Sequence, residues 1–330
     1  MIPSASRPRV LVARRLFPEV AERLSQHFEV DALQEAEPLS PDALVQRLQG
    51  CGGALITGTE RIDAALLDAC PQLRAVCSMA VGFNNIDVPA CTAHRVLASN
   101  APGVLTETTA DFGFALMMAT ARRMAESEHW LRAGHWKQWS YDLFAGSDVH
   151  GATLGILGMG RIGQAIAKRG ALGFDMKVAY HNRSRLSETE ETAVGARYLS
   201  LQDLLREADH LVIVVPYTPH THHLIGAAEL ALMKPTATLT NIARGGVVDD
   251  AALAEALRER RLAAAGLDVF EGEPSVHPGL LSVPNVVLTP HIASASLPTR
   301  RAMAELAATN LIAALTGGQP PTPLNPEVLT

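Results

Sequence analysis

The chain has 330 residues, of which 48% are hydrophobic and 19% charged, and its net charge is −6. This length suggests about two domains, and the composition is that of ordinary globular proteins rather than of disordered or fibrous ones. The negative net charge argues against a partner recognised by bulk positive charge, such as nucleic acid or anionic lipid. No apolar run approaches the roughly 18 residues of a membrane span, and the N-terminus lacks the apolar core of a signal peptide. We therefore expect a cytoplasmic protein with no nucleic-acid partner and no membrane contact.

Cysteines are few and lie in the first third of the chain, at positions 51, 70, 77 and 91. They form no CxxC pair, and their spacing fits neither a zinc site nor a disulfide framework. We expect buried or idle thiols in a reducing compartment.

The first hundred residues alternate short apolar runs with amphipathic stretches. Strands are predicted at 9–13, 28–32, 53–57, 73–77 and 95–99, and helices at 18–27, 41–48 and 64–70. Strands that alternate with helices favour parallel βαβ units over a β-sandwich.

A turn at 100–103 (Asn-Ala-Pro-Gly) marks a crossing point between domains. One long helix is expected over 106–133. The segment 135–148 follows and carries Trp136, Trp139, Tyr141 and Phe144. We expect this aromatic loop to pack either as a hydrophobic plug beneath its own domain or against another subunit.

From residue 153 the alternation resumes. Six strands are predicted, at 154–157, 177–180, 211–215, 238–242, 264–268 and 286–288, with helices at 162–172, 201–207, 227–233, 251–260 and 298–315. Strands this apolar are typical of a parallel sheet buried on both faces.

A glycine-rich turn follows the strand that ends at Leu157 and opens a helix. It reads GMGRIG and consists of Gly158, Met159, Gly160, Arg161, Ile162 and Gly163. The glycines permit a tight turn, close approach of a pyrophosphate and close packing of helix on strand, while the helix N-terminus faces the anion. We expect this loop to bind a dinucleotide.

The end of the next strand bears on the choice between NAD and NADP, because an acidic residue there would bind the ribose 2′-hydroxyl. The chain instead has Asn182, Arg183, Ser184 and Arg185. Two arginines and a serine suit a 2′-phosphate, although an exposed loop can also be basic by chance. NADPH is the expected cofactor, with NADH possible.

Three later segments bring reactive side chains to strand ends. They are 241–246 with Arg244, 267–274 with Asp268, Glu271 and Glu273, and 289–293 with His291. Ligands of open parallel sheets bind beyond the carboxyl ends of the strands. Arginine, glutamate and histidine at one such edge suggest acid–base chemistry, whereas any one of them alone could form a structural ion pair.

With these motifs the chain resembles the D-isomer-specific 2-hydroxyacid dehydrogenases. The matching segments are GMGRIG at 158–163, NIARGGVVD at 241–249, GLDVFEGEP at 266–274 and PHIAS at 290–294. Within the family it looks most like the glyoxylate/hydroxypyruvate/2-ketogluconate reductases, through 181–184 and the aromatic stretch 136–144.

The resemblance implies roles for the residues at the strand ends. Arg244 would bind the substrate carboxylate and keto oxygen, and His291 would give its proton to that oxygen. Glu273 would orient the imidazole and favour its protonated form. Asp268 would lie near the nicotinamide carboxamide, and Ile242 would also contact the cofactor.

The resemblance further implies a substrate loop at 79–87, in which the amides of Val81 and Gly82 receive the carboxylate; from the residues alone it reads as a glycine turn. Thr109 would lie near the cofactor and Pro216 on its adenosine side. The fold implied is two Rossmann-like domains: a discontinuous, flavodoxin-like substrate domain (1–104 and 291–330) and a doubly wound NAD(P)-binding domain (105–290), with the active site in the cleft. A homodimer built on 106–133 is also implied.

His220, His222 and His223 form the remaining conspicuous cluster. Their spacing could suit a metal, but a metal site needs three or four convergent ligands, and no others are evident. We expect no metal.

The leading hypothesis is thus an NADPH-dependent reductase of small 2-ketoacids, such as glyoxylate or hydroxypyruvate. Phosphoglycerate or phosphite oxidation on the same fold is an alternative, whereas formate enzymes of this group have glutamine where Glu273 stands. An alternative of another class is a dinucleotide-sensing binding protein like the transcriptional co-repressors that share this fold.

Overall fold

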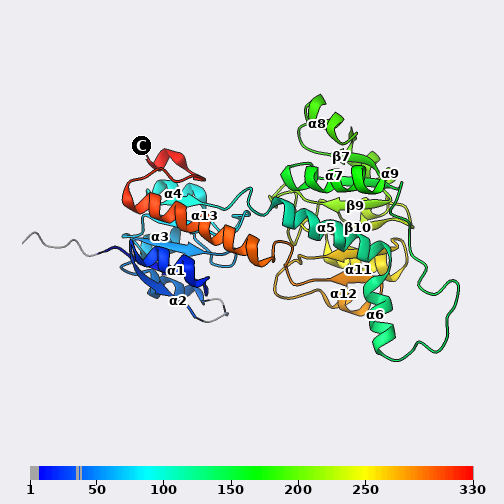
Figure 1. Cartoon of the computed structure of the whole chain (residues 1–330), viewed down its shortest axis with the longest axis horizontal. Coiled ribbons are helices and arrows are strands. Elements are labelled where there is room, and N and C mark those ends of the chain that lie inside the picture. Colours follow the sequence, from blue (N-terminus) through cyan, green and yellow to red (C-terminus); the bar gives the residue numbers. More distant parts are fainter. Residues whose placement is uncertain (1–6, 35–36, 38, 330) are drawn as a thin grey trace, which may run out of the picture. The chain divides into compact units, whose positions relative to one another are not determined.

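The computed structural model describes residues 7–34, 37 and 39–329. It divides into two compact units (Figure 1). Unit 1 contains the described residues up to Leu105 and from Ser296 onward, and unit 2 is Thr106–Ala295. Because the second boundary follows Ala295 rather than residue 290, His291 belongs to unit 2, together with Arg244 and Glu273.

Unit 1 is built on a parallel sheet with the strand order β2-β1-β3-β4-β5, the flavodoxin-like arrangement. The strands are β1 (Arg9–Val12), β2 (Glu29–Ala32), β3 (Gly53–Ile56), β4 (Ala75–Ser78) and β5 (Leu97–Ser99). Successive side chains enter opposite cores: Leu11 packs on one face of the sheet, and Val10 and Val12 on the other. This alternation explains why β1, β3 and β4 read as nearly continuous apolar runs, whereas the edge strand β2 carries Glu29 and Asp31.

The helices of unit 1 cover both faces of this sheet. They are α1 (Pro18–Ser25), α2 (Pro41–Leu48), α3 (Ala64–Ala69), α4 (Val88–Ala93), α13 (Leu297–Thr316) and the 3₁₀ helix η1 (Pro326–Leu329). Helix α4 was not predicted; the Asp87 carboxylate caps it by accepting from the Ala90 amide at 2.9 Å. Helix α13 returns to unit 1 from the end of the chain, and its Leu311 packs against Gly53 of β3.

Unit 2 contains a seven-stranded parallel sheet with the order β12-β11-β10-β9-β6-β7-β8. The strands are β6 (Thr153–Leu157), β7 (Lys177–His181), β8 (Arg197–Tyr198), β9 (His210–Ile213), β10 (Thr238–Asn241), β11 (Ala264–Leu267) and β12 (Val286–Leu288). The order reverses beside β6, as in doubly wound dinucleotide-binding sheets. The predicted fold class is confirmed; the short edge strand β8 is an addition to the six strands expected.

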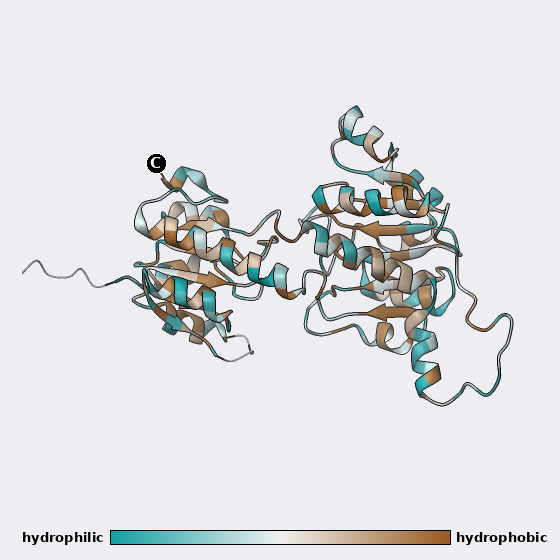
Figure 2. Ribbon diagram, viewed as in Figure 1, coloured by the Kyte–Doolittle hydropathy of each residue, from teal (hydrophilic) through white to brown (hydrophobic). Residues whose placement is uncertain are grey.

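The helices of unit 2 are α5 (Thr106–Ala121), α6 (Met124–Arg132), α7 (Arg161–Phe174), α8 (Glu188–Ala193), α9 (Leu201–Glu207), α10 (Ala227–Leu230), α11 (Asp250–Arg258) and α12 (Pro278–Ser282). In Figure 2 the strands of both sheets are predominantly hydrophobic, while the helices mix hydrophobic and hydrophilic residues. The side chain of Val212 enters the core shared with α5 and α7, whereas its neighbours Leu211 and Ile213 enter the opposite core.

The single helix predicted over 106–133 is wrong. Arg123 adopts a left-handed conformation with φ of 52°, which ends one helix and starts the next. Its guanidinium donates two hydrogen bonds to Glu126, at 2.8 and 2.9 Å, and these hold the break. The sequence did not reveal the break, because the residues on either side of it all favour helix and neither glycine nor proline marks the boundary.

The aromatic segment after α6 is not a plug under its own domain. It runs away from the sheet before returning to β6 (Figure 1), and Trp136, Trp139 and Tyr141 are 54%, 73% and 92% exposed. Of the four aromatic residues, only Phe144 turns back, with its ring 5.4 Å from that of Trp130.

No helix in the described part of the chain is long and apolar enough to cross a membrane.

The four cysteines are free and buried, as expected. Burial raises the pKa of Cys77 to about 12 and that of Cys91 to about 11. Thiolates of Cys77 and Cys91 are therefore scarce at neutral pH.

Candidate active site

The glycine loop lies between β6 and α7, at the reversal of strand order. Gly158 has φ of +104°, and a Cβ there would meet the Val214 backbone at 2.8 Å. A Cβ on Gly163 would lie 2.3 Å from the Gly158 carbonyl oxygen, whereas one on Gly160 would meet nothing within 4 Å. The loop is thus closely packed against its own unit and open at Gly160, the N-cap of α7. Its free helix N-terminus, with Arg161 and Ile162 in the first turn, fits a dinucleotide pyrophosphate.

Side chains after β7 divide into those with partners in the protein and those without. The Asn182 amide oxygen accepts from the Met159 amide at 2.6 Å, so Asn182 supports the glycine loop. Arg185 donates two hydrogen bonds to Glu191, at 2.8 and 2.7 Å. Bonds from Arg185 and Tyr180 lower the pKa of Glu191 to about 2. Arg185 is therefore engaged, and its expected part in binding a 2′-phosphate would require this pair to open.

Arg183 and Ser184 remain available after β7. Both are exposed, and no hydrogen bond or ion pair of Arg183 occurs within the residues that the structure describes. Of the two arginines in the basic corner predicted from the sequence, Arg183 is thus the one without an internal ion pair among the described residues.

The other expected cofactor residues surround this end of the sheet. Thr109 in α5 is 6% exposed, and its hydroxyl has no partner among the described residues. Pro216 follows β9 and accepts a hydrogen bond from the Thr221 hydroxyl at 2.8 Å through its carbonyl. Ile242 is buried after β10, where it packs against Gly113 of α5. Its side chain therefore belongs to the core of unit 2.

Arg244 follows β10 in a turn held by buried Asn241. The Asn241 side chain accepts from the Ala243 amide at 3.0 Å and donates to the Arg244 carbonyl at 3.4 Å. A Cβ on Gly245 would lie 1.7 Å from the Phe270 carbonyl oxygen, so only glycine fits beside Arg244.

The Arg244 guanidinium is partly buried and has no acidic partner. It donates to the Ala243 carbonyl at 2.7 Å, and it forms no ion pair with any described residue. Burial lowers the pKa of this guanidinium, and the charge of Glu273 opposes that shift. Such a group retains donors for an anionic ligand.

His291 and Glu273 form a hydrogen-bonded pair, with Nδ1 and Oε2 2.8 Å apart. The other Glu273 oxygen accepts from the Phe270 amide at 2.9 Å. Burial raises the pKa of Glu273, but bonds from His291 and Phe270 and the charges of His291 and Arg244 outweigh it, so the net pKa lies below its ordinary value. Glu273 is therefore a carboxylate that orients the imidazole through Nδ1 and leaves Nε2 for a substrate.

Asp268 holds the backbone that carries His291. It is fully buried, and its carboxylate accepts from the Thr289 hydroxyl at 2.7 Å and from the Ile292 and Ala293 amides at 2.8 Å. His291 has φ of +53°, and its amide donates to the Asp268 carbonyl at 2.9 Å. This positioning role was not seen in the sequence, because it depends on two loops meeting after β11 and β12.

The predicted substrate loop follows β4 in unit 1. Its Val81 carbonyl accepts from the Asn100 side chain at 2.7 Å, and the amides of Val81 and Gly82 donate to no group in the described residues. Two backbone donors in succession can bind a carboxylate.

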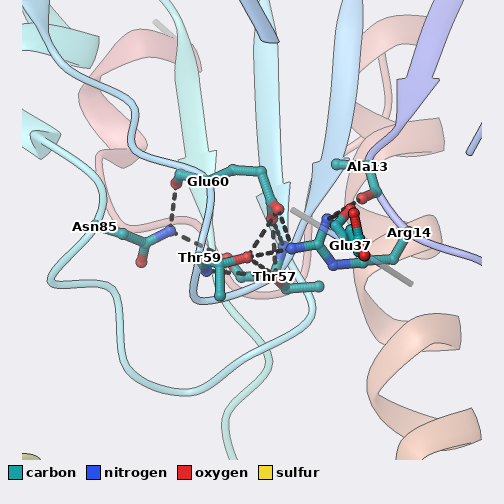
Figure 3. A network of polar contacts seen from close by, with 7 residues as sticks. All are labelled: Ala13, Arg14, Glu37, Thr57, Thr59, Glu60 and Asn85. Carbon is teal, nitrogen blue, oxygen red and sulfur yellow. Dashed lines mark hydrogen bonds and ion pairs between the residues drawn. The ribbon is translucent and has the colours of Figure 1, made fainter. Parts of the chain in front are cut away.

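The other end of that loop is fixed by Asn85 (Figure 3). Its side chain donates to the carbonyls of Thr57 and Glu60, at 3.0 and 2.7 Å. Glu60 is 3% exposed and accepts from Thr57, Thr59 and Arg14. A hydrogen-bonded network around buried Glu60 therefore fixes this end of the loop.

Comparison with known proteins agrees with this geometry. Residues 114–293 match the family model described as D-isomer specific 2-hydroxyacid dehydrogenase, NAD binding domain. The chain is 47% identical over 327 residues to a glyoxylate reductase of Thermococcus onnurineus and 48% identical over 329 residues to one of Aeropyrum pernix. Each alignment covers 98% of this chain and 97% of the relative.

Solved structures give the same result. A protein of Thermus thermophilus is 43% identical and superposes with a TM-score of 0.89, over 96% of this chain and 99% of that one. An NADPH-dependent glyoxylate/hydroxypyruvate reductase of Sinorhizobium meliloti, in complex with NADP and malonate, is 37% identical with a TM-score of 0.84 over 97% of each chain. The chain belongs to the D-isomer specific 2-hydroxyacid dehydrogenase family and is an NAD(P)-dependent oxidoreductase.

Proposed function

We propose that the protein is an NADPH-preferring reductase that converts small 2-ketoacids to D-2-hydroxyacids. Glyoxylate and hydroxypyruvate are the proposed substrates, with 2-ketogluconate a further member of the class. The observation that carries this proposal is the partly buried Arg244, which forms no ion pair with the described residues, in the unit that also holds the His291–Glu273 pair. Glyoxylate reductases are also among the relatives most similar over the full chain.

The proposed roles follow from the hydrogen-bond donors of each residue that are not used within the protein. Arg244 binds the substrate carboxylate and keto oxygen through its planar fork. His291 donates the Nε2 proton to the keto oxygen, while Glu273 accepts from Nδ1 and stabilises the imidazolium. A bound reduced nicotinamide supplies the hydride. The amides of Val81 and Gly82 are proposed to receive the substrate carboxylate.

Preference for NADPH is assigned to Arg183 and Ser184. Arg183 carries a charge without a partner in the described part of the chain, and no carboxylate occupies positions 180–185. A 2′-phosphate would meet a guanidinium and a hydroxyl there, whereas a ribose 2′-hydroxyl would lack its usual acidic partner. The remaining cofactor contacts are assigned to the glycine loop, Thr109 and Pro216.

We also infer a homodimer in the cytoplasm. Support comes from the exposed aromatic side chains at 136, 139 and 141, since large exposed apolar patches are typical of interfaces. Four buried free thiols fit a reducing compartment. Light scattering on the purified protein tests the assembly: a mass near 35.2 kDa would contradict it, and twice that value would agree.

A kinetic panel tests the activity. Reduction of glyoxylate, hydroxypyruvate and 2-ketogluconate is followed by the loss of NADPH or NADH absorbance. Oxidation of phosphoglycerate and phosphite is followed by the gain of that absorbance from NADP⁺ or NAD⁺. We expect kcat/KM to be highest with NADPH and a small 2-ketoacid. No turnover with any substrate would favour a dinucleotide-sensing protein, and a higher kcat/KM with NADH would reverse the cofactor preference.

A further inference from the structure

Three potential metal ligands meet in unit 2, apart from the residues assigned to reduction. His222 and His223 lie in the loop after β9, and Glu271 lies in the loop after β11. One ligand atom from each residue lies within 4.8 Å of the other two. We propose that these side chains bind a first-row divalent metal ion of the zinc class. The sequence indicated the histidine cluster but no further ligand, and we expected no metal there, because Glu271 is distant from the histidines along the chain.

The Nδ1 atom of each imidazole has a polar neighbour, within hydrogen-bond distance for His222 and further away for His223. The Tyr217 hydroxyl lies 3.1 Å from His222 Nδ1, and an Asp249 carboxylate oxygen lies 3.9 Å from His223 Nδ1. Histidine ligands in metal sites commonly hydrogen-bond a carboxylate or another polar group through the nitrogen that does not bind metal. Both rings therefore have Nε2 as the nitrogen available for an ion.

The chemistry of the three side chains selects the metal. Two imidazoles and one carboxylate form a zinc-binding set that leaves a fourth position for water. His223 Nε2 and Glu271 Oε2 are now 2.9 Å apart. Zinc with bonds of about 2.1 Å keeps tetrahedral ligand atoms roughly 3.4 Å apart, so His223 and Glu271 must move slightly apart. The His222 and His223 rings are stacked with their centroids 3.9 Å apart, so both rings must rotate for their Nε2 atoms to face one ion. Exposed fractions of 36% for the His223 side chain and 44% for that of Glu271 leave room for these movements.

Hydrogen bonds of their own backbone amides fix the positions of His223 and Glu271. The His223 amide donates to the Gly246 carbonyl at 2.7 Å, and the Glu271 amide donates to Asp250 at 3.0 Å. Gly246 and Glu271 are each two residues from a residue assigned to reduction, Arg244 and Glu273 respectively. A bound ion would thus tie together the loops that carry those residues, without using either of them.

Zinc binding to the untagged, chelator-treated chain tests the proposal by calorimetry and by metal analysis after dialysis. We expect one zinc per chain and a melting temperature raised by about 5 °C at a hundredfold excess over Kd. His222→Ala and Glu271→Gln should each weaken zinc binding at least tenfold. Cobalt(II) should give visible absorption bands typical of a four-coordinate site, which both variants lose.

His220→Ala is the matched control, because His220 belongs to the same loop but not to the ligand set. It should bind zinc as the parent chain does. No stoichiometric binding by the folded parent would overturn the proposal, as would equal affinity in all three variants, which would place the zinc elsewhere. Because binding is measured without substrate or cofactor, these results stand independently of the reductase assays.

Discussion

Arg14 and Arg244 occupy similar places in the two units but have different partners. Each follows a strand of a parallel sheet, β1 for Arg14 and β10 for Arg244. Arg14 lies 2.8 Å from the Glu60 carboxylate and donates to the Thr59 hydroxyl at 2.6 Å (Figure 3). Arg244 has only the carbonyl of Ala243 as a hydrogen-bond acceptor within the described residues.

The difference in partners separates an arginine that stabilises the fold, Arg14, from one that can bind a ligand, Arg244. A buried ion pair that is fully bonded has little left to offer a ligand, and breaking it destabilises the fold. A guanidinium that is partly buried without a carboxylate is costly, as the lowered pKa of Arg244 indicates, and a ligand carboxylate would offset that cost. The predictions below test this distinction, beginning with the largest expected effect.

Replacement of Arg244 by alanine should lower kcat/KM for glyoxylate by roughly 10²- to 10⁴-fold, because two charge-assisted hydrogen bonds of about 1.5–3 kcal/mol each are lost. The affinity for NADPH, measured by fluorescence titration, should stay close to that of the parent. The melting temperature should not fall, since the variant removes a partly buried charge that forms no ion pair within the described part of the chain.

Arg244→Lys is the matched control. It keeps the charge but not the planar fork, so its kcat/KM should lie between those of the parent and of Arg244→Ala. Activity of Arg244→Ala equal to that of the parent would show that another group binds the substrate carboxylate.

Arg14→Met should instead act on stability. The Glu60 carboxylate would remain buried without its cation, which costs about 3 kcal/mol or more. Urea unfolding measures the loss, and the double variant with Glu60→Gln should recover part of it because the stranded charge is removed. If Arg14→Met were no less stable than Arg244→Ala, the distinction between the two arginines would be wrong.

Much of the fold could be predicted from local pattern. Strands β3, β4 and β6 are largely apolar because both faces are buried, and the glycine loop carries its own turn chemistry in Gly158 and Gly163. The order of the strands, the discontinuous first unit and the residues at the strand ends follow from these signals together with the family resemblance.

Features that depend on tertiary contacts could not be predicted. The left-handed Arg123 that separates α5 from α6 has no signal in the apolar periodicity. The engagement of Arg185 by Glu191, and that of Asp268 by Thr289, Ile292 and Ala293, require segments to meet in space. Residue type alone makes Arg183 and Arg185 equivalent, and only their partners distinguish them.

Glu273→Gln tests the charge of the carboxylate that orients His291. We expect kcat to fall roughly 10- to 100-fold, less than the loss of a complete acid–base catalyst. The lowered pKa keeps Glu273 ionised at neutral pH, so its stabilising bonds are present above its ordinary pKa of about 4.3. They are lost as pH falls through the lower folded-state value.

Unfolding measured between pH 7 and pH 3 tests this sign. Replacement by glutamine should remove the part of the acid destabilisation that comes from Glu273, and the stability difference between parent and variant should shrink as the pH falls through that range. A difference that grows toward acid pH would contradict the lowered pKa.

The two arginines after β7 repeat the comparison on a smaller scale. Arg183→Ala should raise KM for NADPH about tenfold, because one exposed charge-assisted contact with the 2′-phosphate is lost. KM for NADH should not change. Arg185→Ala should leave both KM values near those of the parent, because its guanidinium is already bonded to Glu191.

The contrast between these variants discriminates more sharply than either value alone. Both remove one positive charge from the same loop, so a general electrostatic effect on a polyanionic cofactor would weaken NADPH binding equally and would decline with salt in both. An effect confined to Arg183→Ala and to NADPH requires a direct contact. An equal or larger effect of Arg185→Ala would mean that the Glu191 pair opens when the cofactor binds, and the rule that an internally paired arginine is structural would then fail at this loop.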